Sequence, residues 1–269
     1  MPEQKVQQIG WHLMSTDAAF FLVDDVSYAF ADGTSVLSQV NWHIPCGAFH
    51  CLVGRSGCGK TTLLKLVAGL LQPSDGQIMI QQAAVYGPSS KVGFVFQTPA
   101  LLEWLSVIDN VLLPISLHRR VLDEDRDTAR ELLELVGIVG LAERFPAQLS
   151  GGQQSRAALA RALVTSPPAL LMDEPFAALD AITREELQED LLHLVALRKT
   201  TVLFVTHDIA EAVYLADRVA IMDSGQLTPA ASIDMPRPRA ADCRYDKQFV
   251  DTCQQIRAAM TLQTGKTAC

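Results

Sequence analysis

The sequence predicts an α/β fold with a mainly parallel central sheet and a separate helical subdomain. Two observations predict this fold. Short apolar runs of strand length alternate with longer helical segments, an order typical of parallel sheets whose strands are joined by helices. Several of these runs end in glycine or in polar residues, and α/β proteins place ligand sites at the carboxyl ends of such strands. The stretch 98–167 has mainly helical patterns, so we expect it to form the helical subdomain.

Three regions follow from the order of the elements. Residues 1–20 are expected to be an irregular lead, and Met14 is an alternative to Met1 as the natural start, because organised sequence begins at FFLVDDVSYAF. Residues 21–229 form the main domain. Residues 230–269 are expected to be a short tail, in which the proline-rich MPRPRA at 235–240 leads to a terminal helix.

Each element of the main domain has its own pattern. FHCLVG at 49–54 is a predicted strand that ends in glycine, and KTTLLKLVAGLL after it is helical. GQIMI and VGFVF are further short strands. Residues 123–137 begin with an acid-rich turn and end in glycine, which predicts a helix. ALLMDEP and TVLFVTHD contain buried strands that end in polar residues.

The composition excludes several classes of protein. The net charge of −8 argues against nucleic acid as a partner, because a phosphate backbone requires a basic surface. The six cysteines form no CxxC pair and no metal-ligand pattern with the six histidines, so we expect reduced thiols and a cytosolic chain. No run is apolar enough to predict a transmembrane helix or a signal peptide.

A phosphate-binding loop, here called the cradle, occupies residues 54–62. GRSGCGKTT matches the pattern G-x-x-x-x-G-K-[ST] between a strand and a helix. Its glycines let backbone N–H groups turn toward phosphate oxygens, and its lysine reaches the outer phosphates. TGKTAC near the C-terminus lacks the upstream glycine and strand, so we expect no phosphate site there. The expected nucleotide-binding residues are Gly54, Arg55, Ser56, Gly57, Cys58, Gly59, Lys60, Thr61 and Thr62.

Two acids at the end of a later strand predict hydrolysis. ALLMDEP places Asp173 and Glu174 at the carboxyl end of its strand. We expect Asp173 to hold Mg²⁺ through water, with the hydroxyl of Thr61 as a metal ligand, and Glu174 to polarise the attacking water as general base. The alternative is an acid pair that merely ends a strand, and the cradle upstream favours the hydrolytic interpretation.

A second helix N-terminus carries LSGGQ at 149–153, here called the signature segment. Gly151 and Gly152 have no side chains, and no obvious base stands beside Ser150 or Gln153. Bare glycine amides and a hydroxyl at the start of a helix bind anions. The segment is therefore a candidate second grip on a phosphate group.

Together these motifs resemble the ATP-binding subunits of ABC transporters. LSGGQ is that family's signature, and the resemblance covers about residues 21–228. It identifies Gln97 as the Q-loop glutamine, which contacts Mg²⁺ and senses the membrane partner, and His207 as the switch histidine near the γ-phosphate. It also identifies AALD at 177–180 as the D-loop that contains Asp180, although Ala177 stands where the family often has serine.

The resemblance further implies cofactors, assembly and location. It implies ATP and Mg²⁺ as cofactors, an antiparallel β subdomain, and Phe30 as the aromatic that stacks on adenine, with Tyr28 as the alternative. It implies a homodimer in which the signature segment of one chain closes on ATP held by the cradle of the other. The implied partners are permease subunits and, indirectly, a periplasmic or lipoprotein solute-binding protein, with no nucleic acid. The chain is then a peripheral subunit on the cytoplasmic face of the inner membrane.

The detailed pattern of residues 95–117 resembles the nitrate, sulfonate and taurine importers. Glu103 and Asp109 are its only charged residues, which indicates a buried lobe together with a docking surface for a membrane partner beside Gln97. THDIAEAVYLADRV and the RPR of the tail agree with this subfamily, whereas SGGQQSRAALARAL departs from the usual QRVxxARAL continuation. The implied function is ATP-driven import of a small anionic solute.

Three alternatives remain open at this point. The first is an ABC importer ATPase for another small solute. The second is a soluble ABC ATPase acting on ribosomes or DNA, which an acidic single cassette does not favour. The third is a P-loop kinase or GTPase, which would lack the signature segment and the Q-loop.

Overall fold

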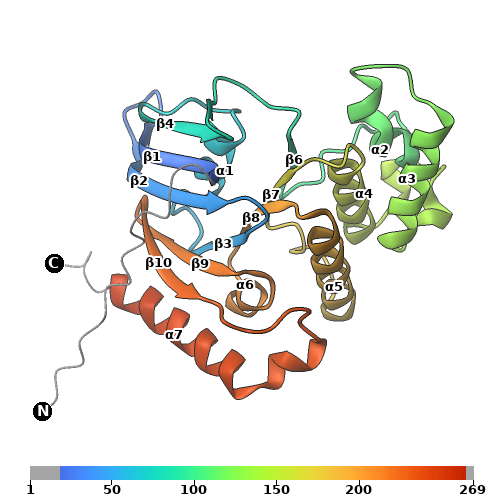
Figure 1. The fold of residues 1–269 in the computed structure, drawn as a ribbon. Coiled ribbons are helices and arrows are strands. Elements are labelled where there is room, and N and C mark those ends of the chain that lie inside the picture. The colour runs from blue at the N-terminus through green and yellow to red at the C-terminus, as the bar shows by residue number, and fades with distance from the viewer. Residues whose placement is uncertain (1–18, 265–269) are drawn as a thin grey trace, which may run out of the picture.

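Two β-sheets form the centre of the molecule in the computed structural model, which describes residues 19–264 (Figure 1). The smaller sheet is antiparallel, with the order β2-β1-β4-β5. In the larger sheet, of order β10-β9-β3-β8-β7-β6, all neighbours are parallel except β10 and β9. The strands are β1 (Ala19–Ala29), β2 (Ser35–Pro45), β3 (Phe49–Gly54), β4 (Asp75–Ile80), β5 (Ala83–Ala84), β6 (Val92–Val95), β7 (Ala169–Asp173), β8 (Thr201–Thr206), β9 (Arg218–Asp223) and β10 (Gln226–Ser232).

The parallel strands are buried on both faces, which explains their unbroken apolar sequences. Every residue of β3, β7 and β8 is buried. Successive side chains of a strand point to opposite faces. Cys51 therefore packs in an apolar cluster with α5 (Ala181–Arg198) and α6 (Ile209–Leu215), whereas Leu52 packs in a second cluster with α1 (Lys60–Val67) and the antiparallel sheet.

The helical subdomain contains α2 (Val107–Ser116), α3 (Asp123–Leu135) and α4 (Gly151–Leu163), with 3₁₀ turns at Val139–Leu141 and Pro146–Gln148. Figure 1 shows these helices together at one side of the sheets. The predicted acidic turn lies at the start of α3, where carboxylates favour the helix dipole. Gly137 follows α3 with φ +68°, a left-handed conformation that ends helices. The predicted α/β fold is confirmed: it has a mainly parallel core sheet, an antiparallel β subdomain and a helical subdomain.

The two ends of the chain differ in detail from the prediction. β1 begins at Ala19, inside the lead that we predicted to be irregular, because Ala19 pairs with Pro45 and Phe20 is buried. Met14 lies outside the described residues. The tail contains a 3₁₀ turn, η4 (Ala241–Tyr245), and the long helix α7 (Lys247–Thr264), which packs against α6, β9 and β10.

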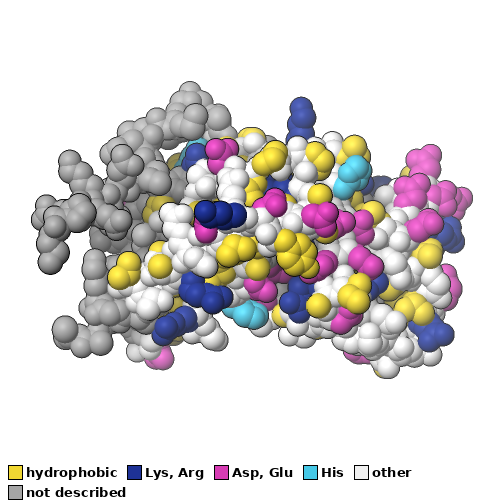
Figure 2. Space-filling model, turned by 90° about the horizontal axis from the view of Figure 1, so that it is seen from below, with side chains coloured by type: hydrophobic (Ala, Val, Ile, Leu, Met, Phe, Trp, Pro, Cys, Tyr) yellow, Lys and Arg dark blue, Asp and Glu magenta, His cyan; other side chains and the backbone are white. Residues whose placement is uncertain are grey.

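The surface of the molecule carries charges of both signs. Figure 2 shows hydrophobic, acidic and basic side chains interspersed on one face, with acidic side chains gathered at the end that carries the helical subdomain. This face has no broad basic patch of the kind that a phosphate backbone needs. Within residues 19–264, no helix combines the length and apolar content that crossing a membrane requires.

Candidate active site

The cradle connects the end of β3 to the start of α1. Gly57 and Gly59 have φ values of +79° and +107°, the left-handed region that favours glycine. A Cβ on Gly59 would lie 2.8 Å from the side chain of Leu37, and a Cβ on Gly54 would collide with the carbonyl oxygen of Met222. Gly54 is required because the backbone of β9 approaches it closely, and Gly57 and Gly59 are favoured by their left-handed backbone conformation.

Lys60 folds back over the cradle. Its side chain is buried, and its ammonium group donates to the carbonyl oxygens of Gly54 and Arg55, both at 2.8 Å. Both acceptors are neutral, so the positive charge remains available to an anion. Cys58 lies beside the ammonium group, and burial raises the pKa of its thiol, which favours the uncharged form.

A hydrogen bond joins the cradle to the strand that carries the acids. The hydroxyl of Thr61 donates to Oδ1 of Asp173 over 3.2 Å. Asp173 is the last residue of β7 and is only 4% exposed. Burial raises the pKa of this carboxyl, while the hydrogen bond from Thr61 opposes the shift. A buried carboxylate beside a hydroxyl is a pair of hard oxygen donors, the ligand type that Mg²⁺ prefers, so these two residues fit that metal.

Glu174 and His207 lie in direct contact. Oε2 of Glu174 lies 2.9 Å from Nδ1 of His207, and the histidine side chain is 65% exposed against 17% for the glutamate. Glu174 has φ +46°, and its backbone N–H donates to the carbonyl oxygen of Val205. A left-handed conformation costs on the order of 1–3 kcal/mol for a residue with a side chain. The strained backbone and the neighbouring strand thus hold the carboxylate beside the imidazole.

The order of four strands brings the predicted residues to one edge. β3, β8, β7 and β6 are neighbours in the sheet, and their carboxyl ends lead to the cradle, His207, Asp173 with Glu174, and Gln97. Gln97 is exposed two residues beyond the end of β6. The carboxyl edge of a parallel sheet is where α/β proteins bind ligands. The strand order therefore brings the predicted site residues to the same edge of the sheet.

The signature segment lies apart from this edge, at the start of α4. The Ser150 hydroxyl accepts from the N–H of Gln153, and the Gln153 side chain accepts from the N–H of Ser150, so the two residues cap their own helix. A Cβ on Gly151 would meet no described atom within 4 Å, and one on Gly152 would meet Leu179 of the D-loop. Among the described residues, no cradle atom lies within 4 Å of a Cβ built on either glycine.

Asp180 and Phe30 occupy separate surface positions. The carboxylate of Asp180 accepts from the N–H of Thr183 and caps α5, and this hydrogen bond lowers the pKa of Asp180. Phe30 follows β1 and is 48% exposed, with its ring edge-on to Tyr28 at 5.5 Å between centroids. The exposed ring of Phe30 is free to stack on a planar ligand.

Two residues without a predicted site role hold the loop after Gln97. Arg161 of α4 donates to the carbonyl oxygens of Pro99 and Ala100 at 2.7 and 2.8 Å. Asn110, fully buried in α2, exchanges hydrogen bonds with the backbone of Leu102. Arg161 and Pro99 are 62 residues apart, so no local sequence pattern reveals the contact. The loop is thereby fastened to the helix that begins at the signature segment.

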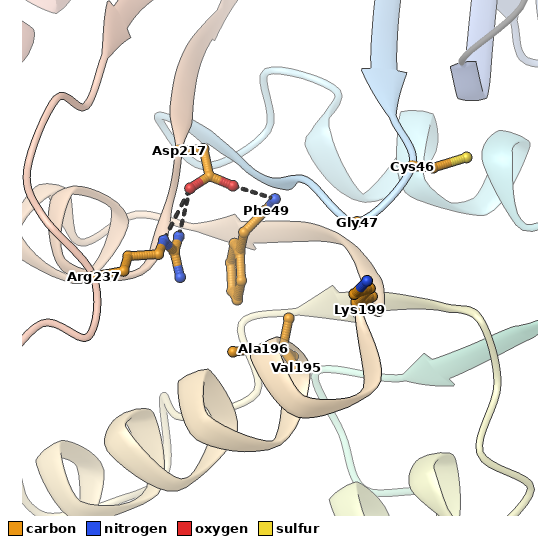
Figure 3. Close-up of a pocket in the computed structure, with 8 residues that line it drawn as sticks. All are labelled: Cys46, Gly47, Phe49, Val195, Ala196, Lys199, Asp217 and Arg237. Carbon is orange, nitrogen blue, oxygen red and sulfur yellow. Dashed lines mark hydrogen bonds and ion pairs between the residues drawn. The ribbon is translucent and has the colours of Figure 1, made fainter.

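An open pocket of about 430 Å³ lies at the opposite edge of the larger sheet (Figure 3). It adjoins the first residue of β3 and the residue before β9, so it is remote from the carboxyl ends. It is not part of the candidate active site. Its lining residues are Cys46, Gly47, Phe49, Val195, Ala196, Lys199, Asp217 and Arg237.

Comparisons with known proteins identify relatives of this chain. The family model described as ABC transporter matches residues 37–177. The chain is 42% identical over 223 residues to an aliphatic sulfonates import ATP-binding protein of Bacillus cereus, covering 81% of this chain and 88% of that protein. It is 47% identical over 205 residues to a protein of the same description from Pseudomonas syringae pv. tomato, covering 76% of this chain and 74% of that protein.

A solved structure extends the agreement to the fold. The ATP-binding cassette MJ0796, solved as a dimer in a post-hydrolysis state bound to ADP and Pi, superposes with a TM-score of 0.74. Its sequence is 31% identical, and the match covers 80% of this chain and 100% of that chain. From the cradle, the two acids, the family model and these relatives it follows that the chain belongs to the ABC transporter family, as an ATP-binding subunit that hydrolyses ATP.

Proposed function

We propose that this subunit energises the import of small anionic solutes, with aliphatic sulfonates as the first candidate. The relatives from Bacillus cereus and Pseudomonas syringae, at 42% and 47% identity, carry that solute in their names. Nitrate, a small anion, and taurine, which carries a sulfonate group, are further candidates. Another small solute is the alternative, because the chain itself has no described contact that would select one anion over another.

The observation that carries the hydrolytic role is the contact of Glu174 with His207 beside the cradle. Lys60 neutralises the outer phosphates, Glu174 accepts the proton of the attacking water, and His207 orients the reacting groups near the γ-phosphate. Bound Mg²⁺ supplies further neutralisation of phosphate charge. Thr61 and Asp173 would hold this ion, and Gln97 would reach it from the neighbouring strand.

A dimer with two shared ATP sites completes the proposal. Ser150 and Gly151 lie at a helix N-terminus whose partial positive charge suits a phosphate group. The space around Gly151 is open in its own chain. The dimeric state of MJ0796 supports the same assembly here. Each signature segment would then grip the γ-phosphate held by the partner's cradle, and hydrolysis would release the two halves.

The helical subdomain offers a surface for a permease. Trp104, in the loop fastened by Arg161 and Asn110, is 73% exposed, and Leu117 at the end of α2 is 74% exposed. Exposed apolar side chains of this size suit a protein partner. The chain would then lie peripherally on the cytoplasmic face of the inner membrane, and a solute-binding protein would contact the permease rather than this subunit.

A soluble ABC ATPase that acts on ribosomes or DNA is the less favoured alternative. The net charge of −8 and the mixed surface in Figure 2 do not suit a nucleic-acid backbone. Exposed Trp104 instead favours an apolar protein partner.

Reconstituted transport tests the proposal. The chain would be purified from solubilised membranes with its permease, placed in proteoliposomes with ATP and the solute-binding protein, and assayed for uptake of labelled ethanesulfonate, nitrate and taurine. We expect ATP-dependent uptake of a small anion, and no uptake when Glu174→Gln replaces the wild type. The importer assignment would be contradicted if no permease co-purified and if ribosomes or DNA stimulated the ATPase activity of the chain.

A further inference from the structure

Three arginines of the segment 235–245, here called the tail clamp, converge on α6. They are Arg237, Arg239 and Arg244, and two of them belong to the RPR motif of the tail. α6 begins two residues after His207 and is only seven residues long. A helix of this length depends on outside contacts for its position, because short helices are marginal on their own.

The RPR motif holds the C-terminal end of α6. Arg237 donates to the carbonyl oxygen of Leu215 at 2.8 Å, and Arg239 donates to those of Val213 and Tyr214 at 3.2 and 2.7 Å. Arg239 is 6% exposed. The last carbonyls of a helix lack partners within the helix and carry partial negative charge. Arginine supplies both the hydrogen-bond donors and the positive charge that these carbonyls favour. This end of α6 is thereby fixed by the tail.

Arg237 also connects the tail clamp to the strand that leads to the cradle. Its guanidinium pairs with Oδ1 of Asp217, and Oδ2 of Asp217 accepts from the N–H of Phe49 at 2.7 Å (Figure 3). Phe49 is the first residue of β3. One carboxylate therefore joins the tail, the start of β9 and the start of β3.

Arg244 contacts side chains of α6 and joins them to α5 through a buried relay. Its guanidinium stacks 3.5 Å from the ring centre of Tyr214 and donates to Oε1 of Gln188 at 2.8 Å. The amide of Gln188 in turn donates to Oε1 of Glu211 at 2.9 Å. Gln188 and Glu211 are 2% and 7% exposed, so these hydrogen bonds are shielded from water and hold their geometry. Gln188 lies on α5, the helix capped by Asp180 of the D-loop.

The relay ends beside the switch histidine. The backbone N–H of Glu211 and that of Ala210 donate to Oδ1 of Asp208, which caps α6. The N–H of Asp208 donates to the hydroxyl of Thr206 at 3.0 Å. Thr206 and Asp208 flank His207 in the chain, so the position of α6 determines where the imidazole stands relative to Glu174.

We propose that the tail clamp is a positioning element for hydrolysis, which holds α6 against α5 and β3 and so keeps His207 within hydrogen-bonding distance of Glu174. Arg244 and Gln188 act through the position of His207, because their contacts run to α6 and α5. This inference rests on the proposed role of His207 in ATP hydrolysis. It gives the segment 235–245 a function in the catalytic cycle that is separate from substrate binding.

The test compares Arg244→Ala with Arg257→Ala in the full chain. Arg257 is exposed on α7 and is not part of the relay. Arg257→Ala therefore removes the same charge from the tail and leaves the relay intact. We expect Arg244→Ala to lower kcat about 10-fold, the change produced by a modest misplacement of a reacting group, with unchanged ATP affinity. Gln188→Met, which keeps the length of the side chain and removes both hydrogen bonds, should have a similar effect. The kcat of Arg257→Ala should match that of the wild type. Thermal unfolding of all three variants checks that each one is folded.

A double-mutant cycle separates positioning from general destabilisation. In the His207→Ala background, single-turnover hydrolysis should be insensitive to Arg244→Ala, because the group that the clamp positions is gone. An equal loss in both backgrounds would overturn the proposal in favour of a purely structural role. If kcat is unchanged in Arg244→Ala but falls strongly in His207→Ala, the positioning role of the tail clamp is overturned and the proposed role of His207 stands. Full activity of His207→Ala would overturn the proposed role of that histidine, and the clamp with it.

Discussion

Glu174→Gln is expected to slow ATP hydrolysis by about 10²- to 10⁴-fold, the range for loss of a general base. The amide has the shape of the carboxylate and retains an oxygen for the contact with His207 at 2.9 Å, so the site should keep its geometry. It cannot accept the proton of water. Steady-state phosphate release measures the loss, and calorimetry should show that ATP affinity is retained.

The same variant should accumulate an ATP-bound dimer, because the γ-phosphate that bridges the two chains is not removed. Size-exclusion chromatography with ATP and Mg²⁺ detects the dimer. Glu143→Gln is the matched control, since Glu143 is an exposed glutamate of the helical subdomain. Turnover in Glu174→Gln equal to that of the control would remove Glu174 from the role of base.

Lys60→Ala is expected to abolish hydrolysis and to weaken ATP binding, because it removes the positive charge at the centre of the cradle. The structure adds a consequence for stability. The lysine side chain is buried and bonds the carbonyl oxygens of Gly54 and Arg55, so the alanine variant should also lose some stability of the loop. Calorimetry with ATP and thermal unfolding separate the two effects.

Lys65→Ala on the same helix provides the control for Lys60→Ala. Lys65 is half-buried and lies about one turn further along α1, so its loss changes the net charge equally without entering the cradle. Equal ATP affinity in the Lys60→Ala variant and this control would count against the cradle as the nucleotide site.

The residues at the carboxyl edge could be predicted because their signals are local. The cradle occupies nine consecutive positions, and Glu174 and His207 each come directly after an apolar strand. Their proximity depends on the strand order β3-β8-β7-β6, which follows from pairing between distant segments. No pattern within one strand specifies that order. The sequence thus predicts the members of the site, and the sheet brings them together.

Contacts between distant segments explain what the sequence did not predict. Arg244 meets Gln188 across 56 residues, and both are ordinary polar residues in their own helices. The RPR motif was visible, but its role depends on where the end of α6 lies. Gln153 is a related case, because the structure shows it capping its own helix beside its predicted contribution to the partner's site. The start of β1 at Ala19 depends in the same way on its pairing with β2.

The central claim is that each ATP site is built from two chains, and a heterodimer tests it most directly. One chain carries Lys60→Ala and the other carries Gly151→Asp. A Cβ at Gly151 meets no described atom of its own chain within 4 Å, so the aspartate should leave the fold intact. Its carboxylate would repel the γ-phosphate held by the partner's cradle, since like charges are poorly screened in a closed crevice.

If the sites are shared, one composite site contains both defects, and the other pairs an intact cradle with an intact signature segment. The measurement is vanadate trapping of labelled nucleotide in the defined heterodimer, reconstituted with its permease, beside the two mutant homodimers. The account predicts about one trapped nucleotide per heterodimer and almost none per homodimer. Trapping in the heterodimer no higher than in the homodimers would contradict it, because that result requires each chain to close its own signature segment on its own cradle.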